Sequence, residues 1–133
     1  MDNRYKWEND KEYNYRICTS KLSNEIKLGL TQIVGQAQMK IPNYVKAINI
    51  FSRLLKALEG SNVPEIYMKV NGFLLTGVEC YLAAAKNLQE STKVSEGKAK
   101  HIYKAQALIN EGNCWVEISK IRIAEAVEIC ESR

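Results

Sequence analysis

The sequence predicts an all-α protein, an antiparallel up-down-up-down four-helix bundle with a long C-terminal helix. Seven glycines and two prolines are few turn-forming residues for a chain of 133, which argues against many short strands. Between three short breaks, at 39–42, 60–62 and 90–92, apolar residues recur at steps of three or four, as on one face of a helix. Short connections make consecutive helices antiparallel neighbours.

The length suits a single core, so residues 1–133 are expected to form one helical-bundle domain, with residues 1–8 as a loosely ordered arm. Apolar residues make up 46% of the chain and charged residues 26%, which excludes a disordered composition. No apolar run is long enough to span a membrane, and the N-terminus lacks the apolar core of a signal peptide.

The first helix is expected to begin at a cap formed by Asn9 or Asp10 and to run for about 30 residues. Its apolar stripe consists of Tyr15, Cys18, Leu22, Ile26, Leu30, Ile33 and Ala37. The aromatic residues of the opening segment are Tyr5, Trp7, Tyr13 and Tyr15, interleaved with basic residues. They form either a binding arm or rings that hold the helix end against the bundle, and their amphipathic character favours packing.

The second helix, of about 18 residues, is expected to have Pro42 in its first turn and Gly60 at its C-terminal cap. Its apolar stripe is Val45, Ile48, Phe51, Leu55 and Leu58. The third helix, of about 28 residues, is expected to start with a capping box formed by Asn62 and Glu65. Its stripe is Ile66, Val70, Phe73 or Leu74, Gly77, Tyr81, Ala84 and Leu88.

The last segment carries a strict seven-residue repeat, which predicts one helix from about residue 95 to residue 131. One position of the repeat is filled by Ile102, Ile109, Val116, Ile123 and Cys130, and the other by Ala105, Gly112, Ser119 and Ala126. The small residues allow two helix backbones to approach closely, which accounts for a glycine inside a helix. A break at 110–113 would give two shorter helices, but the unbroken repeat favours one.

A second apolar stripe lies on nearly the opposite side of this helix. We call it the outer face, and it comprises Cys114, Trp115, Ile118, Ile121, Arg122 and Ile129. A surface helix of a monomer needs only one apolar stripe, so this helix is either packed on both sides within its own bundle or exposed to a partner. The favoured function is a non-enzymatic protein–protein interaction module, a small subunit or adaptor, whose partner is another protein or a second copy in a homo-oligomer.

The single histidine indicates an alternative function. His101 is followed three residues later by Lys104, and on a four-helix bundle this pair resembles the histidine-phosphotransfer domains of phosphorelays. The resemblance implies that the His101 imidazole accepts a phosphoryl group and that Lys104 neutralises its charge. Ala105 stands where that family usually has glycine, and Tyr103 stands where it usually has leucine.

A cluster of lysines around this histidine suggests a third function. Lys93, Lys98, Lys100 and Lys104 lie within twelve residues that contain one acid, Glu96. Such a patch fits phosphates or an acidic partner, and a small nucleic-acid-binding subunit would use it. An ordinary solvated face is the other interpretation, because the patch is small.

Motifs for nucleotide binding, hydrolysis and metal binding do not occur in the sequence, so we expect no enzyme activity, cofactor, metal or small-molecule substrate. We also expect no membrane partner. Cysteines 18, 80, 114 and 130 lack metal-site spacing, and we expect free thiols, three of them on apolar helix faces. Free thiols imply a reducing, cytoplasmic setting.

Overall fold

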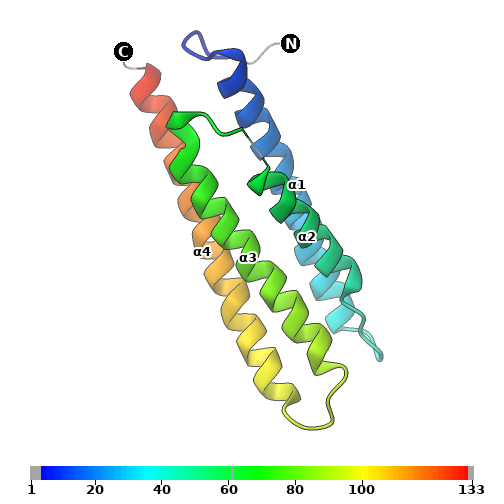
Figure 1. Ribbon diagram of the computed structural model, residues 1–133. Helices are drawn as coiled ribbons and strands as arrows, with labels where there is room; N and C mark the ends of the chain where they lie inside the picture. The colour runs from blue at the N-terminus through cyan, green and yellow to red at the C-terminus, as the bar shows by residue number, and fades with distance from the viewer. Residues whose placement is uncertain (1–3, 61, 132–133) are drawn as a thin grey trace.

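The computed structural model describes residues 4–60 and 62–131, which form four α-helices, one 3₁₀ helix and no strand. The elements are α1 (Asp10–Ala37), α2 (Val45–Glu59), η1 (Glu65–Tyr67), α3 (Met68–Ser91) and α4 (Lys98–Glu131). The start of α1 and the end of α4 lie at one end of the bundle, and the α1–α2 and α3–α4 connections lie at the other, which we call the loop end (Figure 1). The predicted all-α four-helix bundle is therefore confirmed, and α4 continues through Gly112 without a break.

The start of α1 follows the predicted cap. Asn9 Oδ1 accepts a hydrogen bond from the backbone N–H of Glu12 at 2.8 Å, and Glu12 Oε1 accepts one from the Asn9 N–H at 2.9 Å. This reciprocal pair satisfies two of the N–H groups that a helix start leaves without intrahelical partners.

The start of α2 differs from the prediction, because α2 begins at Val45 and leaves Pro42 in the connection. A side chain from another helix holds this connection: Gln89 Oε1 of α3 accepts a hydrogen bond from the Tyr44 N–H at 2.7 Å. The other end of α2 is as predicted, since Gly60 is its C-cap and donates its N–H to Lys56 O at 2.9 Å.

The capping box predicted at Asn62 and Glu65 is wrong. Pro64 is extended and precedes the 3₁₀ turn η1, so α3 starts only at Met68. Tyr67, at the end of η1, is 1% exposed, and its ring stacks on that of Tyr15 from α1 with centroids 5.2 Å apart. The burial of the Tyr67 ring accounts for the missing cap. Burying a large aromatic side chain stabilises the fold more than a single capping hydrogen bond does.

The contact between α3 and α4 is the most extensive in the molecule, and small residues allow it. Ala105, Gly112, Val116, Ser119 and Cys130 are buried along α4, as the seven-residue repeat predicts. A Cβ atom added to Gly112 would lie 2.7 Å from Tyr81 Cε1 and 3.1 Å from Gly77 O. The prediction is wrong at Ile102, which is 39% exposed because it borders a hollow at the loop end.

Phe51 joins the remaining helices to this pair. Its side chain, from α2, is fully buried; its ring lies 5.3 Å from the Tyr81 ring between centroids, and its edge faces Gly29 of α1. A Cβ atom at Gly29 would lie 2.5 Å from Phe51 Cζ, so a glycine is required there for α1 to approach α2.

The core-facing stripes of α1 and α2 are rotated slightly from those predicted. In α1, Tyr15, Ile26 and Ile33 are buried as predicted and Leu22 and Leu30 are half-buried, but Cys18 and Ala37 are exposed, and Thr19 and Gly29 are buried although they were not predicted to be. In α2, Ala47, Ile50 and Leu54 join Phe51 and Leu58 in the core, and Val45 is 45% exposed. Thr19 tolerates burial because its hydroxyl donates to Arg16 O at 2.9 Å. In α3 the predicted Val70, Leu74, Gly77, Tyr81, Ala84 and Leu88 are all buried.

Substituting alanine for Gly112 tests the close approach of α3 and α4. We expect Gly112→Ala to lower the free energy of unfolding by about 1–2 kcal/mol, because the new methyl group meets Tyr81 and the Gly77 carbonyl. Gly72→Ala in α3 is the matched control, since its Cβ meets nothing within 4 Å, and it should stabilise the protein by about 0.5–1 kcal/mol. Urea unfolding measures both. A Gly112→Ala variant at least as stable as the wild type would contradict the close contact.

Candidate functional site

The outer face of α4 is open to solvent along much of its length. Ile121 is 51% exposed and Ile129 is 59% exposed, and Cys114 and Arg122 are exposed as well. Trp115 and Ile118 are half-buried at the edge of the face. Ile121 and Ile129 lie about two turns apart on one side of the helix, and with the half-buried Ile118 they form an apolar surface of the kind that marks contact with a partner.

An aromatic residue of α3 extends the outer face. The rings of Phe73 and Trp115 stack with centroids 5.6 Å apart and planes at 18°, and Trp115 Nε1 donates to Glu111 Oε1 at 3.4 Å. The sequence left Phe73 and Leu74 as alternatives for the core stripe. The structure buries Leu74 and leaves Phe73 half-buried against Trp115, so Phe73 is a candidate site residue that periodicity alone did not find.

An ion pair lies in the middle of the outer face. Arg122 Nη1 contacts Glu125 Oε2 at 2.9 Å, with about half of each side chain exposed. In this exposed position the pair contributes little to the stability of the monomer. The ion pair lies between Ile118 and Ile129 along the helix, so a partner that covers these isoleucines would also contact the two charges.

His101, the candidate phosphoacceptor, is half-buried where α4 meets α3. Its Nδ1 lies 3.2 Å from Asn87 Oδ1. Asn87 Nδ2 donates to Ala83 O at 2.8 Å, so the oxygen of this amide faces the imidazole, and the contact requires a proton on Nδ1. In a neutral His101 the free lone pair is then on Nε2. Lys104, the residue expected to neutralise the phosphoryl charge, is exposed about one turn further along α4.

The candidate phosphate contacts Lys93, Lys98, Lys100 and Lys104 are all exposed. Lys93 lies in the α3–α4 connection, and the other three lie in the first two turns of α4. Within the described residues none of the four forms an ion pair with a carboxylate. Their charges therefore remain available to an external anion.

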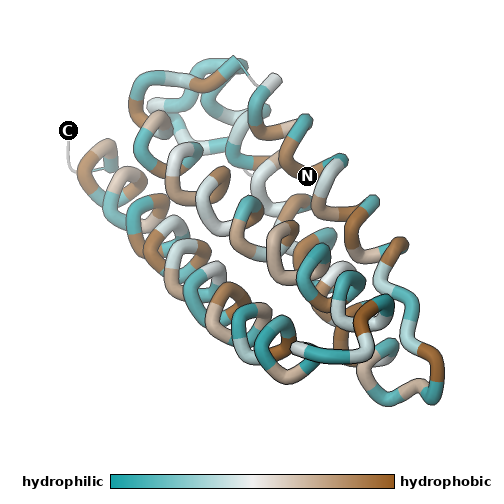
Figure 2. Tube along the Cα trace, turned by 60° about the horizontal axis from the view of Figure 1, so that its bottom comes forward, coloured by the Kyte–Doolittle hydropathy of each residue, from teal (hydrophilic) through white to brown (hydrophobic). Residues whose placement is uncertain are grey.

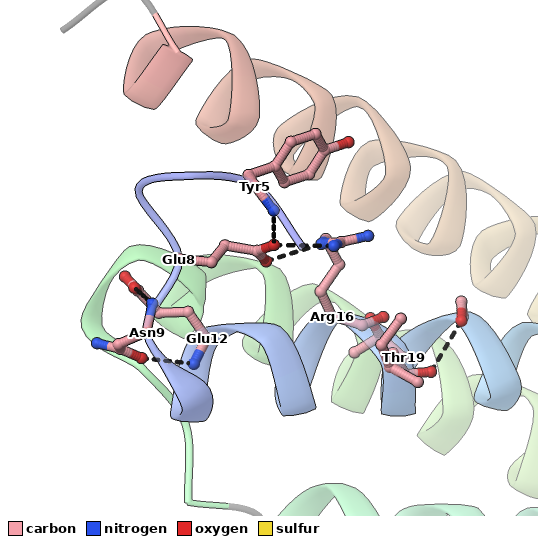
Figure 3. A network of polar contacts seen from close by, with 8 residues as sticks. Tyr5, Glu8, Asn9, Glu12, Arg16 and Thr19 are labelled. Atoms are coloured by element: carbon pink, nitrogen blue, oxygen red, sulfur yellow. Dashed lines mark hydrogen bonds and ion pairs between the residues drawn. The ribbon is translucent and has the colours of Figure 1, made fainter. Parts of the chain in front are cut away.

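The opening segment packs on the bundle through a buried carboxylate, which Figure 3 shows with its partners. The Glu8 side chain is fully buried and accepts hydrogen bonds from Arg16 Nε, Arg16 Nη2 and the Tyr5 N–H, each at 2.8 Å. The Arg16 guanidinium also lies 4.5 Å from the centre of the Tyr5 ring, which is placed between α1 and α4. Of the segment expected to be an arm, residues 4–8 are held by these contacts, and residues 1–3 lie outside the described part.

The other aromatic residues of this segment also pack. Tyr15 is buried and donates its hydroxyl to Asn71 Oδ1 at 3.0 Å, and the rings of Tyr5 and Trp7 stack 5.6 Å apart. Arg4 lies 4.6 Å from the centre of the Tyr13 ring. These contacts agree with the packing interpretation of the aromatic residues rather than with a free binding arm.

A groove runs between α1 and α4 beside this cluster, because these two helices make only sparse contact. Its volume is about 640 Å³. Hydroxyl side chains of α1 form one wall and apolar side chains of α4 form the other: Thr19, Ser20 and Ser23 against Ile123, Ala124 and Val127. Lys120, Glu128 and Glu131 of α4 also line the groove, so it presents polar and apolar groups side by side.

The thiols divide evenly between surface and interior. All four cysteines are free; Cys80 and Cys130 are buried, and Cys18 and Cys114 are exposed. The prediction that Cys18 lies on an apolar helix face is therefore wrong, whereas Cys130 does lie in the buried seam. Burial and the neighbouring Glu111 raise the pKa of the Cys80 thiol, which disfavours the reactive thiolate. Among the described residues no cluster of three or more His, Cys, Asp or Glu side chains is placed to hold a metal ion.

Comparison of the chain with protein-family models, with curated proteins and with solved structures finds no match. The functional argument consequently depends on the geometry and charge of this chain alone. Of the surfaces described above, the outer face of α4 combines exposed apolar area with a defined arrangement of charge.

Removing the Glu8 carboxylate tests how firmly the opening segment is held. Burial opposes ionisation of Glu8, but the hydrogen bonds from Arg16 and Tyr5 outweigh it and hold the pKa of Glu8 below its ordinary value. A lowered pKa in the folded state adds stability above the ordinary carboxyl pKa, and this stability is lost as the pH falls below it. We expect Glu8→Gln to cost about 1.5–3 kcal/mol at neutral pH and to be closer to the wild type at acid pH.

Urea unfolding of both proteins at neutral pH and in acid measures this difference. Glu12→Gln is the control for the loss of a carboxylate in the same segment, since Glu12 makes the capping contact but no ion pair with Arg16. A cost for Glu8→Gln that does not change with pH would show that the charge of Glu8 is unimportant.

Proposed function

We propose that this protein is a non-enzymatic interaction module that associates with a second copy of itself through the outer face of α4. The observation that carries the proposal is the exposure of Ile121 and Ile129 on a face whose central charges are self-complementary. The four free thiols support a reducing, cytoplasmic setting for such a module.

The order of residues on the outer face favours a second copy over an unrelated partner. Ile118 lies four residues before Arg122, and Ile129 lies four residues after Glu125. Read in reverse, the pattern exchanges Ile118 with Ile129 and Arg122 with Glu125, while the counterpart of Ile121 is Ala126. When two α4 helices pack antiparallel about a two-fold axis between Arg122 and Glu125, each Arg122 faces the other chain's Glu125, and each Ile118 faces the other chain's Ile129. A two-fold interface requires such a self-complementary surface.

The energetics of this arrangement are favourable. Fully burying an isoleucine stabilises by about 1.5–3 kcal/mol, and the outer face offers three of them. Trp115, held in place by Phe73, is a rigid aromatic residue at the edge of the contact, and Trp and Arg are enriched at the residues that contribute most to interfaces. The charge pairs lie next to the two-fold axis and chiefly set the register of the two helices, because any other register would place like charges opposite one another or leave them without partners.

Reversing the charges tests this geometry. We expect Arg122→Glu alone and Glu125→Arg alone each to weaken the dimer by about tenfold or more, because each places two like charges opposite one another. The double variant Arg122→Glu, Glu125→Arg should recover the dimer, since both pairs re-form with exchanged partners. Sedimentation equilibrium measures the three affinities. Recovery is not expected if a foreign partner, rather than a second copy, uses this face.

Replacing isoleucines of the outer face tests whether this face mediates self-association, without testing the register of the two helices. The variant Ile118→Glu, Ile121→Glu should be monomeric by light scattering and as helical as the wild type by circular dichroism. Met68→Glu is the matched control, because Met68 is 60% exposed outside the outer face and should remain dimeric when replaced. A wild type that is monomeric at high concentration would exclude self-association, and a double variant that unfolds would place these isoleucines in the core.

Phosphotransfer through His101 is the second candidate function, and the hydrogen bond to Asn87 favours it. That bond orients the imidazole and leaves the lone pair on Nε2, the form needed for attack on a phosphoryl group, with the Lys104 cation nearby. This function predicts acid-labile phosphate on the wild type after incubation with a small-molecule phosphodonor or a phosphorylated receiver domain. Labelling should be absent in His101→Gln and reduced in Lys104→Ala. Failure of every donor to label the wild type would exclude it.

A further inference from the structure

Exposed apolar side chains gather at the loop end of the bundle. Six of the ten exposed large hydrophobic residues in the described part of the chain lie there: Val34, Met39, Ile41, Val45, Ile102 and Tyr103. Ile41, between α1 and α2, is 87% exposed, the highest value of the ten. Large aliphatic side chains exposed together in this way indicate a surface that contacts something apolar.

Positive charge is concentrated at the same end. Residues 26–58, which form the second half of α1, the α1–α2 connection and most of α2, contain five basic residues and no acidic residue. Lys40 lies in the connection and Lys46 in the first turn of α2, whereas Lys27, Arg53 and Lys56 lie about two or more turns away from it.

Across the bundle, the α3–α4 connection and the start of α4 add Lys93, Lys98, Lys100 and Lys104. Figure 2 turns the loop end forward and shows hydrophilic residues in both connections. The whole chain has a net charge of only +4, so the rest of the chain is net acidic, and two of its acids, Glu90 and Glu96, lie at the loop end.

A hollow between the two connections brings these features together. Its volume is about 520 Å³. Its apolar lining includes Ile41, Pro42, Tyr44, Leu88 and Ile102, and Lys40 and Lys98 also line it. None of the described residues that line it is acidic. An apolar hollow with two cations suits an amphipathic anion, whose charged group meets the lysines and whose hydrocarbon enters the hollow.

We propose that the loop end docks on the surface of a membrane that contains anionic phospholipid. Ile41 and its aliphatic neighbours enter the boundary between headgroups and acyl chains. The lysines keep their ammonium groups at the level of the lipid phosphates while their methylene stems lie alongside the apolar region. The hollow receives one lipid, with its phosphate between Lys40 and Lys98. No helix in the described residues is long and apolar enough to cross a membrane, and this peripheral contact needs none. Peripheral docking differs from the sequence-based expectation of no membrane partner, which considered only a spanning segment.

The apolar side chains distinguish this partner from a nucleic acid. Phosphates of a duplex would attract the same lysines, but they offer no environment in which an exposed Ile41, Met39 or Val45 is removed from water. Single strands are held largely by bases stacked on aromatic rings. The loop end exposes one such ring, Tyr103, outside the hollow, whereas the hollow is lined mainly by aliphatic groups, with Tyr44 buried. The combination of exposed aliphatic side chains with lysines therefore favours a lipid surface. This inference does not depend on the outer face of α4 or on self-association.

Vesicle co-sedimentation of the full chain tests the proposal, with vesicles of phosphatidylcholine alone and with about one third phosphatidylserine. The wild type should bind the anionic vesicles more tightly than the neutral ones. Ile41→Asp and the double variant Lys40→Glu, Lys98→Glu should each reduce the partition coefficient by about tenfold or more. Met68→Asp and Lys69→Glu are the matched controls, since they change an exposed methionine and an exposed lysine at the other end of α3 and should bind as the wild type does.

A tryptophan at position 41 reports whether the loop end enters the membrane. Ile41→Trp should retain binding, and its fluorescence emission should shift to the blue when anionic vesicles are added. Absence of wild-type binding to anionic vesicles at low salt would overturn the proposal. Binding that depends on the lysines but not on Ile41, together with tighter binding to duplex DNA or RNA than to vesicles, would also overturn it and identify the surface as a nucleic-acid contact. Ile41 is almost fully exposed, so these variants should fold as the wild type does, which circular dichroism checks.

Discussion

The rest of the structure depends on the close approach of α3 to α4 at Gly77 and Gly112. A Cβ atom added to Gly112 would overlap the Tyr81 ring, and one added to Gly77 would lie in tight contact with Val116 and the Gly112 carbonyl, so the two backbones approach closely here. The Tyr81 ring fills the space beside this contact and donates its hydroxyl to Asn113 Oδ1 at 2.6 Å. Phe51 packs on Tyr81, and Gly29 admits Phe51, so α2 and α1 are positioned in turn by the α3–α4 pair.

The exposed surfaces of the molecule are consequences of this asymmetric packing. Because α4 is bound tightly to α3 along one side, its opposite side is directed to solvent, and Phe73 of α3 joins it through Trp115. Contact between α1 and α4 is sparse, so a groove remains between them, closed at one end by Tyr5 and the Glu8–Arg16 pair. The antiparallel course of the helices also brings the α1–α2 connection and the lysine-bearing start of α4 to one end, although they are more than fifty residues apart in the sequence (Figure 1).

Periodicity predicted the buried side of α3 and most of that of α4 correctly, because long helices with one strong apolar stripe have only one way to face a core. It was less successful for α1, where Thr19 rather than Cys18 is buried, since a hydroxyl that bonds to its own helix can replace a thiol at no large cost. It also failed at the starts of α2 and α3. There the deciding contacts, Gln89 with Tyr44 and Tyr67 with Tyr15, join residues from different helices that a local motif does not contain.

The sequence by itself determined the four helices, the seven-residue repeat of the last one and the existence of a second stripe on its opposite side, because these follow from the spacing of residues along one helix. Only the tertiary structure decided that this stripe is open to solvent, that Phe73 belongs with it, and that Asn87 faces His101. The tertiary structure also places Ile41 and Ile102 in one hollow, which Lys40 and Lys98 line as well. Exposure and contact between helices depend on how helices are rotated and paired, and that is set by the summed packing of the core rather than by any local pattern.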